Sequence, residues 1–115
     1  MAVRGHRMAC DLSPGDGGED RGPSPSEMLA ASLGACIALM VCSYCRRHGY
    51  TDGEVRVDLA LELGGKPPAV TGIVVDLQIP RDVPEERREV ILRIARSCPI
   101  HETLRDAVRI DLEIV

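Results

Sequence analysis

The feature that most constrains the fold is the apolar stretch over residues 25–48. Its start carries a strong helix signal, because Ser24 is a good N-cap, Pro25 suits the first helical position and Glu27 completes a capping box. The residues that follow are mainly Ala, Leu, Met, Ile and Cys, with no charge until Arg46, and a glycine ends the run. Because hardly any face of this helix is polar, we expect it to be buried on most sides, between a sheet and a second helix or subunit.

Two segments after this helix predict strands joined by a turn. Residues 54–63 alternate strictly between apolar and charged side chains, so one face should be buried and the other wet. Residues 64–68 form a turn and residues 70–79 return as a second strand, which makes a hairpin. The side chains expected to face inward from the first strand are Val55, Val57, Leu59, Leu61 and Leu63.

The C-terminal third predicts two helices and a last strand. A helix opens at residues 83–86 with an acidic first turn, and a short helix runs from Pro99 to about Asp106. The expected inward side chains are Val90, Ile91, Ile94 and Ala95 in the first helix, and Val108, Ile110, Leu112 and Ile114 in the final strand.

The N-terminal segment, residues 1–24, is Gly-rich and loop-like, with a short edge strand expected around residues 3–12. Residues 13–18 should hold no regular element. Taken with the elements above, the order predicts a single α+β domain over residues 1–115, in which the long helix packs on an antiparallel sheet.

Composition bounds the partners of the chain. At 115 residues it is one domain's worth, and it has no Trp or Phe, so its core must be aliphatic. A domain so poor in large rings gains stability by burying a shared face, so we expect a dimer. The net charge of −4, with dispersed cations, makes nucleic acid a poor partner.

The location is predicted from what the sequence lacks and from its cysteines. Residues 1–12 lack the apolar stretch of a signal peptide, and we expect no window to approach the roughly 18 apolar residues that span a membrane. These expectations place the chain in the cytoplasm. Five cysteines in a reducing compartment argue against a disulfide framework, which leaves buried thiols, a metal site or redox chemistry.

Two cysteines occupy positions where chemistry is possible. Cys36 lies in the middle of the long helix, one turn before Met40, where a cysteine is by default a small core residue. Cys98 precedes Pro99 at the predicted start of a helix, where unpaired N–H groups should lower the pKa of a thiol. His101 could assist from the same turn, although a surface histidine is the commoner outcome.

The remaining cysteines give weaker signals. Cys42 and Cys45 have CxxC spacing, but zinc needs four ligands, and a zinc site made of these two with Cys98 and His101 follows no zinc spacing. Two packed or partly exposed thiols are favoured over a disulfide between them. Cys10 is expected to be incidental.

Two motifs resemble a known family. Residues 18–36, containing Gly-Pro-Ser-Pro-Ser-Glu-Met-Leu and ending in Leu-Gly-Ala-Cys36, resemble the GPSPxExLLxxLGxC signature of OsmC-like proteins. The segment Ser97-Cys98-Pro99-Ile100-His101 resembles the second cysteine motif of that family, and the resemblance covers roughly residues 17–115. It implies an OsmC-like fold and an intertwined homodimer, in which the long helices are central and each active site draws on both subunits.

The resemblance also implies a chemistry. Cys36 would be the peroxidatic cysteine and Cys98 the resolving one, in a thiol peroxidase that reduces organic hydroperoxides. A Cys36 thiolate attacks the O–O bond and becomes a sulfenic acid, Cys98 condenses with it, and a dithiol reductant restores the pair. No metal or other cofactor is required.

A buried thiolate needs a neighbouring cation. In the hydroperoxide reductases that the chain resembles, an arginine from an N-terminal strand serves, held by a glutamate early in the long helix. The candidate arginines are, in order of preference, Arg7, Arg4 and Arg21. The candidate glutamate is Glu27, nine residues before Cys36, whereas the reductases place it ten before, at the position of Ser26 here. Glu27 is equally suited to act only as the capping residue.

The alternative to an enzyme is a non-enzymatic dimer that binds a small apolar ligand. Its pocket would be lined by Leu, Met and Ile, with Cys36 as part of the wall. The presence of Cys36 and Cys98 at both motif positions favours the peroxidase, whereas the unassigned arginine and the shifted glutamate favour the binding module.

Overall fold

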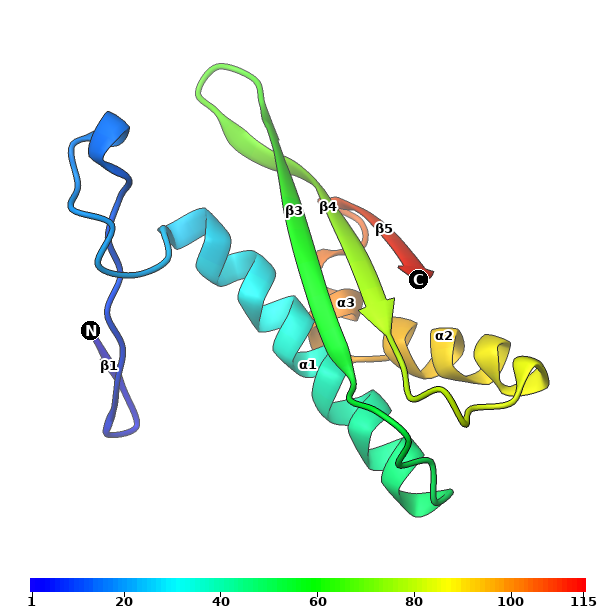
Figure 1. Cartoon of the computed structure of the whole chain (residues 1–115). Helices are drawn as coiled ribbons and strands as arrows, with labels where there is room; N and C mark the ends of the chain where they lie inside the picture. Colours follow the sequence, from blue (N-terminus) through cyan, green and yellow to red (C-terminus); the bar gives the residue numbers. More distant parts are fainter.

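The computed structural model describes all of residues 1–115, and Figure 1 shows three helices packed against a three-stranded sheet. The predicted α+β class is confirmed. In chain order the elements are β1 (Ala2–Val3), β2 (His6–Arg7), the 3-10 turn η1 (Pro14–Asp16), α1 (Pro25–Arg47), β3 (Arg56–Gly64), β4 (Ala69–Gln78), the 3-10 turn η2 (Glu85–Arg87), α2 (Arg88–Arg96), α3 (Pro99–Leu104) and β5 (Arg109–Ile114).

Helix α1 begins at the predicted capping box. The Ser24 hydroxyl accepts from the Glu27 N–H at 3.2 Å, and the Glu27 carboxylate accepts from the Ser24 N–H at 2.8 Å. Pro25 takes the first helical position, where its missing N–H costs nothing. The helix ends at Arg47, and Gly49 follows with φ of 74°, a conformation that glycine adopts without strain.

The sheet has strand order β3-β4-β5 and is mixed. The predicted hairpin is confirmed, because β3 and β4 pair antiparallel. The expectation of a wholly antiparallel sheet is wrong at the last strand, since β5 pairs parallel to β4. The cause is the connection: η2, α2 and α3 carry the chain back across one face of the sheet, and such a crossover returns the next strand in the same direction.

The predicted inward face of β3 holds for most of its length. Val55, just ahead of the strand, and Val57, Leu59 and Leu61 within it are half-buried against the core. Leu63 is 60% exposed, contrary to the prediction. The pairing with β4 shifts register between Glu62 and Leu63, and such an irregularity breaks the alternation that the sequence pattern assumes.

The core lies between one face of the sheet and the helices. Helix α1 contributes Leu33, Ile37 and Val41, and the central strand β4 contributes its inward side chains, all at 0% exposure. The inward side chains predicted for α2 and β5 are also buried or half-buried. Only one face of α1 is covered, however, and Leu39 on another face is 73% exposed, so the prediction of burial on most sides is not met within one chain.

The length and hydropathy of α1 correct the prediction that no window approaches a membrane span. An 18-residue window in Pro25–Arg47 reaches a mean hydropathy of 2.0, which is apolar and long enough to cross a bilayer. The sequence does not show this span as an unbroken run of large apolar residues, because small residues such as Ala, Gly and Ser separate the large ones. In the structure this helix packs on β3 and α2 and supplies the core, as the central helix of a folded domain does.

The N-terminal segment stands partly apart from the sheet (Figure 1). A short hairpin, in which β1 and β2 have two residues each, replaces the expected longer edge strand. Residues 14–16 form a 3-10 turn, which corrects the prediction of no regular element there. The turn is possible because Ser13 donates from its hydroxyl to the Asp16 carboxylate at 2.9 Å and Pro14 fixes the first position.

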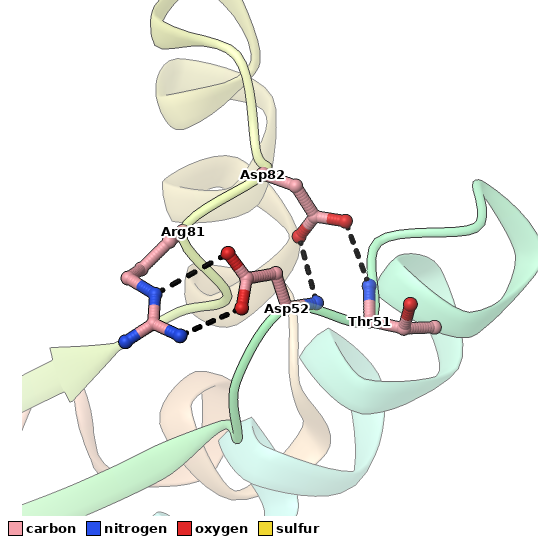
Figure 2. A network of polar contacts seen from close by, with 4 residues as sticks. All are labelled: Thr51, Asp52, Arg81 and Asp82. Atoms are coloured by element: carbon pink, nitrogen blue, oxygen red, sulfur yellow. Dashed lines mark hydrogen bonds and ion pairs between the residues drawn. The ribbon is translucent and has the colours of Figure 1, made fainter.

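Two loops at the C-terminal end of α1 are tied together by a polar network, shown in Figure 2. The Asp82 carboxylate accepts from the Thr51 and Asp52 N–H groups at 2.9 and 3.2 Å. The Arg81 guanidinium donates to the Asp52 carboxylate at 2.7 and 3.3 Å. The loop after α1 is therefore fixed to the loop after β4.

Removal of the Arg81 charge should raise the pKa of Asp52. The hydrogen bond and charge of Arg81 hold the pKa of the Asp52 carboxyl below its ordinary value of 3.8. The stabilisation from this pair is therefore fully present above the unfolded-state pKa and is lost as the pH falls through the lower folded-state pKa. In Arg81→Gln, an NMR titration of the Asp52 carboxyl carbon should give a higher pKa than in the wild type.

Asp11 is the matched control for this titration. Its pKa is lowered by hydrogen bonds from the backbone N–H groups of Leu12, Arg21 and Glu19, and none of these involves Arg81. The pKa of Asp11 should not change in Arg81→Gln. An unchanged Asp52 pKa would contradict the network.

Candidate functional site

Cys36 lies at the middle of α1, on the boundary between the buried face and the surface. It is half-buried and packs against the core cluster, together with Met40 one turn later. Leu33 and Ile37 mark the buried face of α1, and the helical period places Cys36 at the edge of that face. The Cys36 thiol is free and partly accessible.

Cys98 lies at the junction of α2 and α3, where it is the N-cap residue of α3. Its backbone is extended, with φ of −68° and ψ of 145°, and Pro99 takes the first helical position. Its sulfur accepts a hydrogen bond from the His101 N–H at 3.2 Å, as the oxygen of a serine cap would. The thiol is completely buried.

The fold brings these two thiols together. Helix α1 packs against both α2 and α3, and the junction between them holds Cys98. Cys98 belongs to the buried core cluster, and Cys36 packs against that cluster. Cys36 also raises the pKa of Cys98, so the two side chains lie close enough to interact. Two cysteines that are distant in the sequence therefore form one thiol pair.

The environment of Cys98 raises its pKa, which corrects the prediction of a lowered value. Burial is the largest cause, because a thiolate inside the protein loses its water. The N–H groups of His101 and Ile100 lower the pKa, as the helix start predicted, but Cys36 raises it further. Cys98 is thus a protonated thiol at neutral pH. When it loses its proton, the neighbouring N–H groups can stabilise the thiolate.

His101 contributes to this site through its backbone. The His101 side chain is half-buried and does not lie free on the surface. Its Nδ1 atom is buried without a hydrogen-bond partner. Burial lowers the pKa of its imidazole, so the ring is neutral at pH 7. The Cys98 sulfur accepts its hydrogen bond from the backbone N–H of His101 and not from the imidazole ring.

The candidate activating arginines and the candidate glutamate lie toward the N-terminal end of the chain. Glu27 is exposed and forms the capping box. Arg7 is exposed on β2, in a hairpin whose two strands contact each other. Arg4 lies in the turn of that hairpin beside His6, and Arg21 pairs with Glu19 on the surface. None of the groups that shift the pKa of Cys98 is an arginine.

The other cysteines do not join the pair. Cys10 is exposed, Cys42 is half-buried and Cys45 is buried near the C-terminal end of α1. No group of three or more His, Cys, Asp or Glu side chains is arranged to hold a metal ion. The zinc site considered above, with Cys42, Cys45, Cys98 and His101, is therefore not formed.

Sequence reasoning missed a second region of interest beside Cys42 and Cys45. A cavity of about 420 Å³ opens there, lined by these two cysteines, by Tyr50 and by the loop residues that the Asp82 network fixes. The chain's only tyrosines gather nearby, with Tyr44 stacked on His48 at 4.1 Å between ring centroids. The Cys-x-x-Cys spacing was the one available signal for this region.

The fold and the thiol pair define a class of protein, which comparison with known families identifies. The family model for OsmC-like protein matches residues 17–113, so the chain belongs to the OsmC-like family. The structure resembles a Psychrobacter arcticus protein assigned to osmotic stress induction and detoxification response, with a TM-score of 0.82 at 15% identity over 92% of this chain and 77% of that one.

Two further proteins resemble the chain. An organic hydroperoxide resistance protein, OsmC, from Legionella pneumophila has a TM-score of 0.71 at 18% identity, over 90% of this chain and 77% of that one. An uncharacterised Haloferax volcanii protein is 24% identical over 87% of this chain and 76% of its own length. The two structural likenesses establish the fold.

Proposed function

We propose that the protein is a thiol-dependent peroxidase that reduces organic hydroperoxides through Cys36 and Cys98. The observation that carries the proposal is the proximity of these two thiols where α1 packs on the α2–α3 junction, one partly accessible and one fully buried. Membership of a family that includes hydroperoxide resistance proteins supports the same role.

The cycle has three steps. The Cys36 thiolate attacks the O–O bond of a hydroperoxide, which leaves a sulfenic acid on Cys36 and releases an alcohol once a proton is taken up. The Cys98 thiol attacks that sulfenic sulfur, which forms the disulfide and releases water. A dithiol reductant then exchanges with the disulfide, so that both thiols return and the reductant leaves as its own disulfide.

The surroundings of Cys98 suit the resolving step. A buried, protonated thiol does not compete with Cys36 for hydroperoxide, because the thiolate is the nucleophile. Condensation requires Cys98 to lose its proton, and the N–H groups of His101 and Ile100 stabilise the charge that develops. The two roles therefore follow from burial. The accessible sulfur of Cys36 attacks the hydroperoxide, and the buried sulfur of Cys98 resolves the sulfenic acid.

The cation that attack requires is assigned to a second copy of the chain. In this proposal the protein is an intertwined homodimer, and the N-terminal hairpin of one copy brings Arg7 to the Cys36 of the other. Arg4 and Arg21 are the next candidates. Glu27 is exposed at the start of α1, so its carboxylate can hold that arginine as well as cap the helix. The exposed apolar face of α1 supports such a dimer.

A charge on that face should break the dimer. Leu39 is 73% exposed in the single chain and lies on the uncovered side of α1. In Leu39→Glu, burial of an unpaired carboxylate should weaken dimerisation by at least about tenfold, since even 1.4 kcal/mol has that effect. Sedimentation equilibrium would measure it, and peroxidase activity should fall with the dimer.

Leu63→Glu is the matched control. Leu63 is also an exposed leucine, at 60%, but lies at the far end of the β3–β4 hairpin. If both variants dimerise like the wild type, the α1 face is not the interface and the shared active site fails with it.

We also propose that residues 1–115 act as one domain and that the protein is cytoplasmic. All five cysteines are free, which is compatible with a reducing compartment. The competing function, a non-enzymatic dimer that binds a small apolar ligand, is favoured by the shifted glutamate, because Glu27 lies nine residues before Cys36 and not ten.

One treatment separates the two functions. One equivalent of cumene hydroperoxide should convert the reduced protein to a species with a Cys36–Cys98 disulfide, identified by peptide mass spectrometry without reduction. A binding module would keep both thiols free.

A further inference from the structure

A second pair of cysteines lies outside the peroxidase site. Cys42 and Cys45 lie one turn apart near the C-terminal end of α1, and both line the cavity of about 420 Å³ described above. Cys45 is 3% exposed, and Cys42 is half-buried. Residues three apart on a helix lie on the same face, so the two thiols are neighbours in space as well as in sequence.

The cavity is preformed by the rest of the fold. Its wall includes Thr51 and Gly53 from the loop after α1, and Pro80 from the loop after β4. The Asp82 carboxylate and the Arg81–Asp52 ion pair bind these loops to each other (Figure 2). The loops that line the cavity beside Cys42 and Cys45 are therefore joined to each other.

Helix geometry favours a bridging ion over a direct disulfide. On a regular helix, side chains three residues apart have Cβ atoms about 5–6 Å apart, whereas a disulfide needs about 3.5–4.5 Å. Two metal–sulfur bonds of about 2.3 Å each span up to about 4.6 Å between sulfurs. An ion can thus join Cys42 and Cys45 without distortion of α1.

The number of ligands selects the ion. Soft thiolates favour copper(I), zinc and iron–sulfur clusters. Zinc and the clusters require four ligands, and no group of three or more candidate ligands exists in this chain. We propose that Cys42 and Cys45 bind one copper(I) ion as a two-coordinate bis-thiolate, with the release of two thiol protons.

The test uses the full chain with the other cysteines removed. The background variant Cys10→Ser, Cys36→Ser, Cys98→Ser leaves only the proposed ligands. The reduced protein is titrated anaerobically with copper(I) against the chelator bathocuproine disulfonate. We expect one copper per chain, and at least a tenfold weaker affinity when Cys42→Ser is added. X-ray absorption should give two sulfur neighbours per copper.

The controls separate this site from the peroxidase pair and from misfolding. Cys42 is only half-buried, so Cys42→Ser should keep the wild-type circular dichroism spectrum and thermal midpoint. Chelator competition that is unchanged by Cys42→Ser, or copper that binds only when Cys36 and Cys98 are present, would overturn the proposal. Three or four sulfur neighbours per copper would do the same. None of these outcomes bears on hydroperoxide reduction, which does not use Cys42 or Cys45.

Discussion

Replacement of Cys36 by Ser should lower the dithiol-dependent consumption of cumene hydroperoxide by at least about 1,000-fold. A serine hydroxyl is almost entirely protonated at neutral pH and cannot stand in for the sulfur that bonds to the peroxide oxygen, so the loss should approach that of a deleted nucleophile. The measurement is the steady-state rate with dithiothreitol as reductant, at fixed protein concentration because the proposed site is shared between copies.

Cys98→Ser should give a different defect. Its Cys36 can still attack once, so one equivalent of hydroperoxide is consumed quickly and turnover then stops. The sulfenic acid on Cys36 should accumulate and be trapped by dimedone, whereas the wild type forms the disulfide first. Rapid single turnover together with lost steady-state activity assigns attack to Cys36 and resolution to Cys98.

The matched control is Cys10→Ser. Cys10 is an exposed free thiol in the N-terminal segment, and its loss should leave the rate unchanged. Wild-type turnover in Cys36→Ser would eliminate the peroxidase mechanism and leave the ligand-binding function. Full turnover in Cys98→Ser alone would mean that the external dithiol reduces the sulfenic acid directly, and Cys98 would lose its resolving role.

The elements that the sequence predicted well are those with local physical signals. The start of α1 was predicted to the residue, because the partners in a capping box lie three positions apart and need no tertiary contact. The β3–β4 hairpin followed from strict alternation on both sides of a glycine- and proline-rich turn. The failure at Leu63 lies where a register shift interrupts that alternation.

The direction of β5 could not be predicted from local signals. Its alternating pattern fits either orientation, and the choice depends on how α2 and α3 return the chain across the sheet. The hydrogen bonds from the Thr51 and Asp52 N–H groups to Asp82 could not be predicted either, because they also depend on tertiary packing. They join a side chain to backbone groups about 30 residues away, and no sequence pattern marks such contacts.

In the candidate site, too, the features with a local sequence signal were predicted and those that depend on packing were not. Cys98 was correctly placed at a helix start, and its contact with the His101 N–H follows from that position. The direction of its pKa was wrong, because burial depends on the packing of α1 against the α2–α3 junction. The pairing of Cys98 with Cys36 was implied only by the two motifs, since spacing alone gives Cys36 the role of a core residue.

Truncation of Ile37 to Ala should be the most destabilising of the substitutions considered, at about 2–5 kcal/mol. Ile37 is fully buried next to Cys36, in the core formed by α1 and the inward face of β4. The loss combines the transfer energy of the missing methyl and methylene groups with the cavity that they leave. The thermal midpoint should fall by roughly 10–20 °C.

Leu63→Ala removes comparable apolar bulk from an exposed site and should cost less than about 0.5 kcal/mol. Both variants are compared with the wild type by urea unfolding at one protein concentration. A small loss in Ile37→Ala, equal to that in Leu63→Ala, would mean that α1 does not pack on the sheet as described. Because Ile37 takes no part in the chemistry, Ile37→Ala should keep wild-type hydroperoxide turnover at temperatures well below its thermal midpoint. On heating, this variant should lose activity and fold together. Cys36→Ser should behave in the opposite way, folded but inactive, which separates the packing role of this helix from its chemical role.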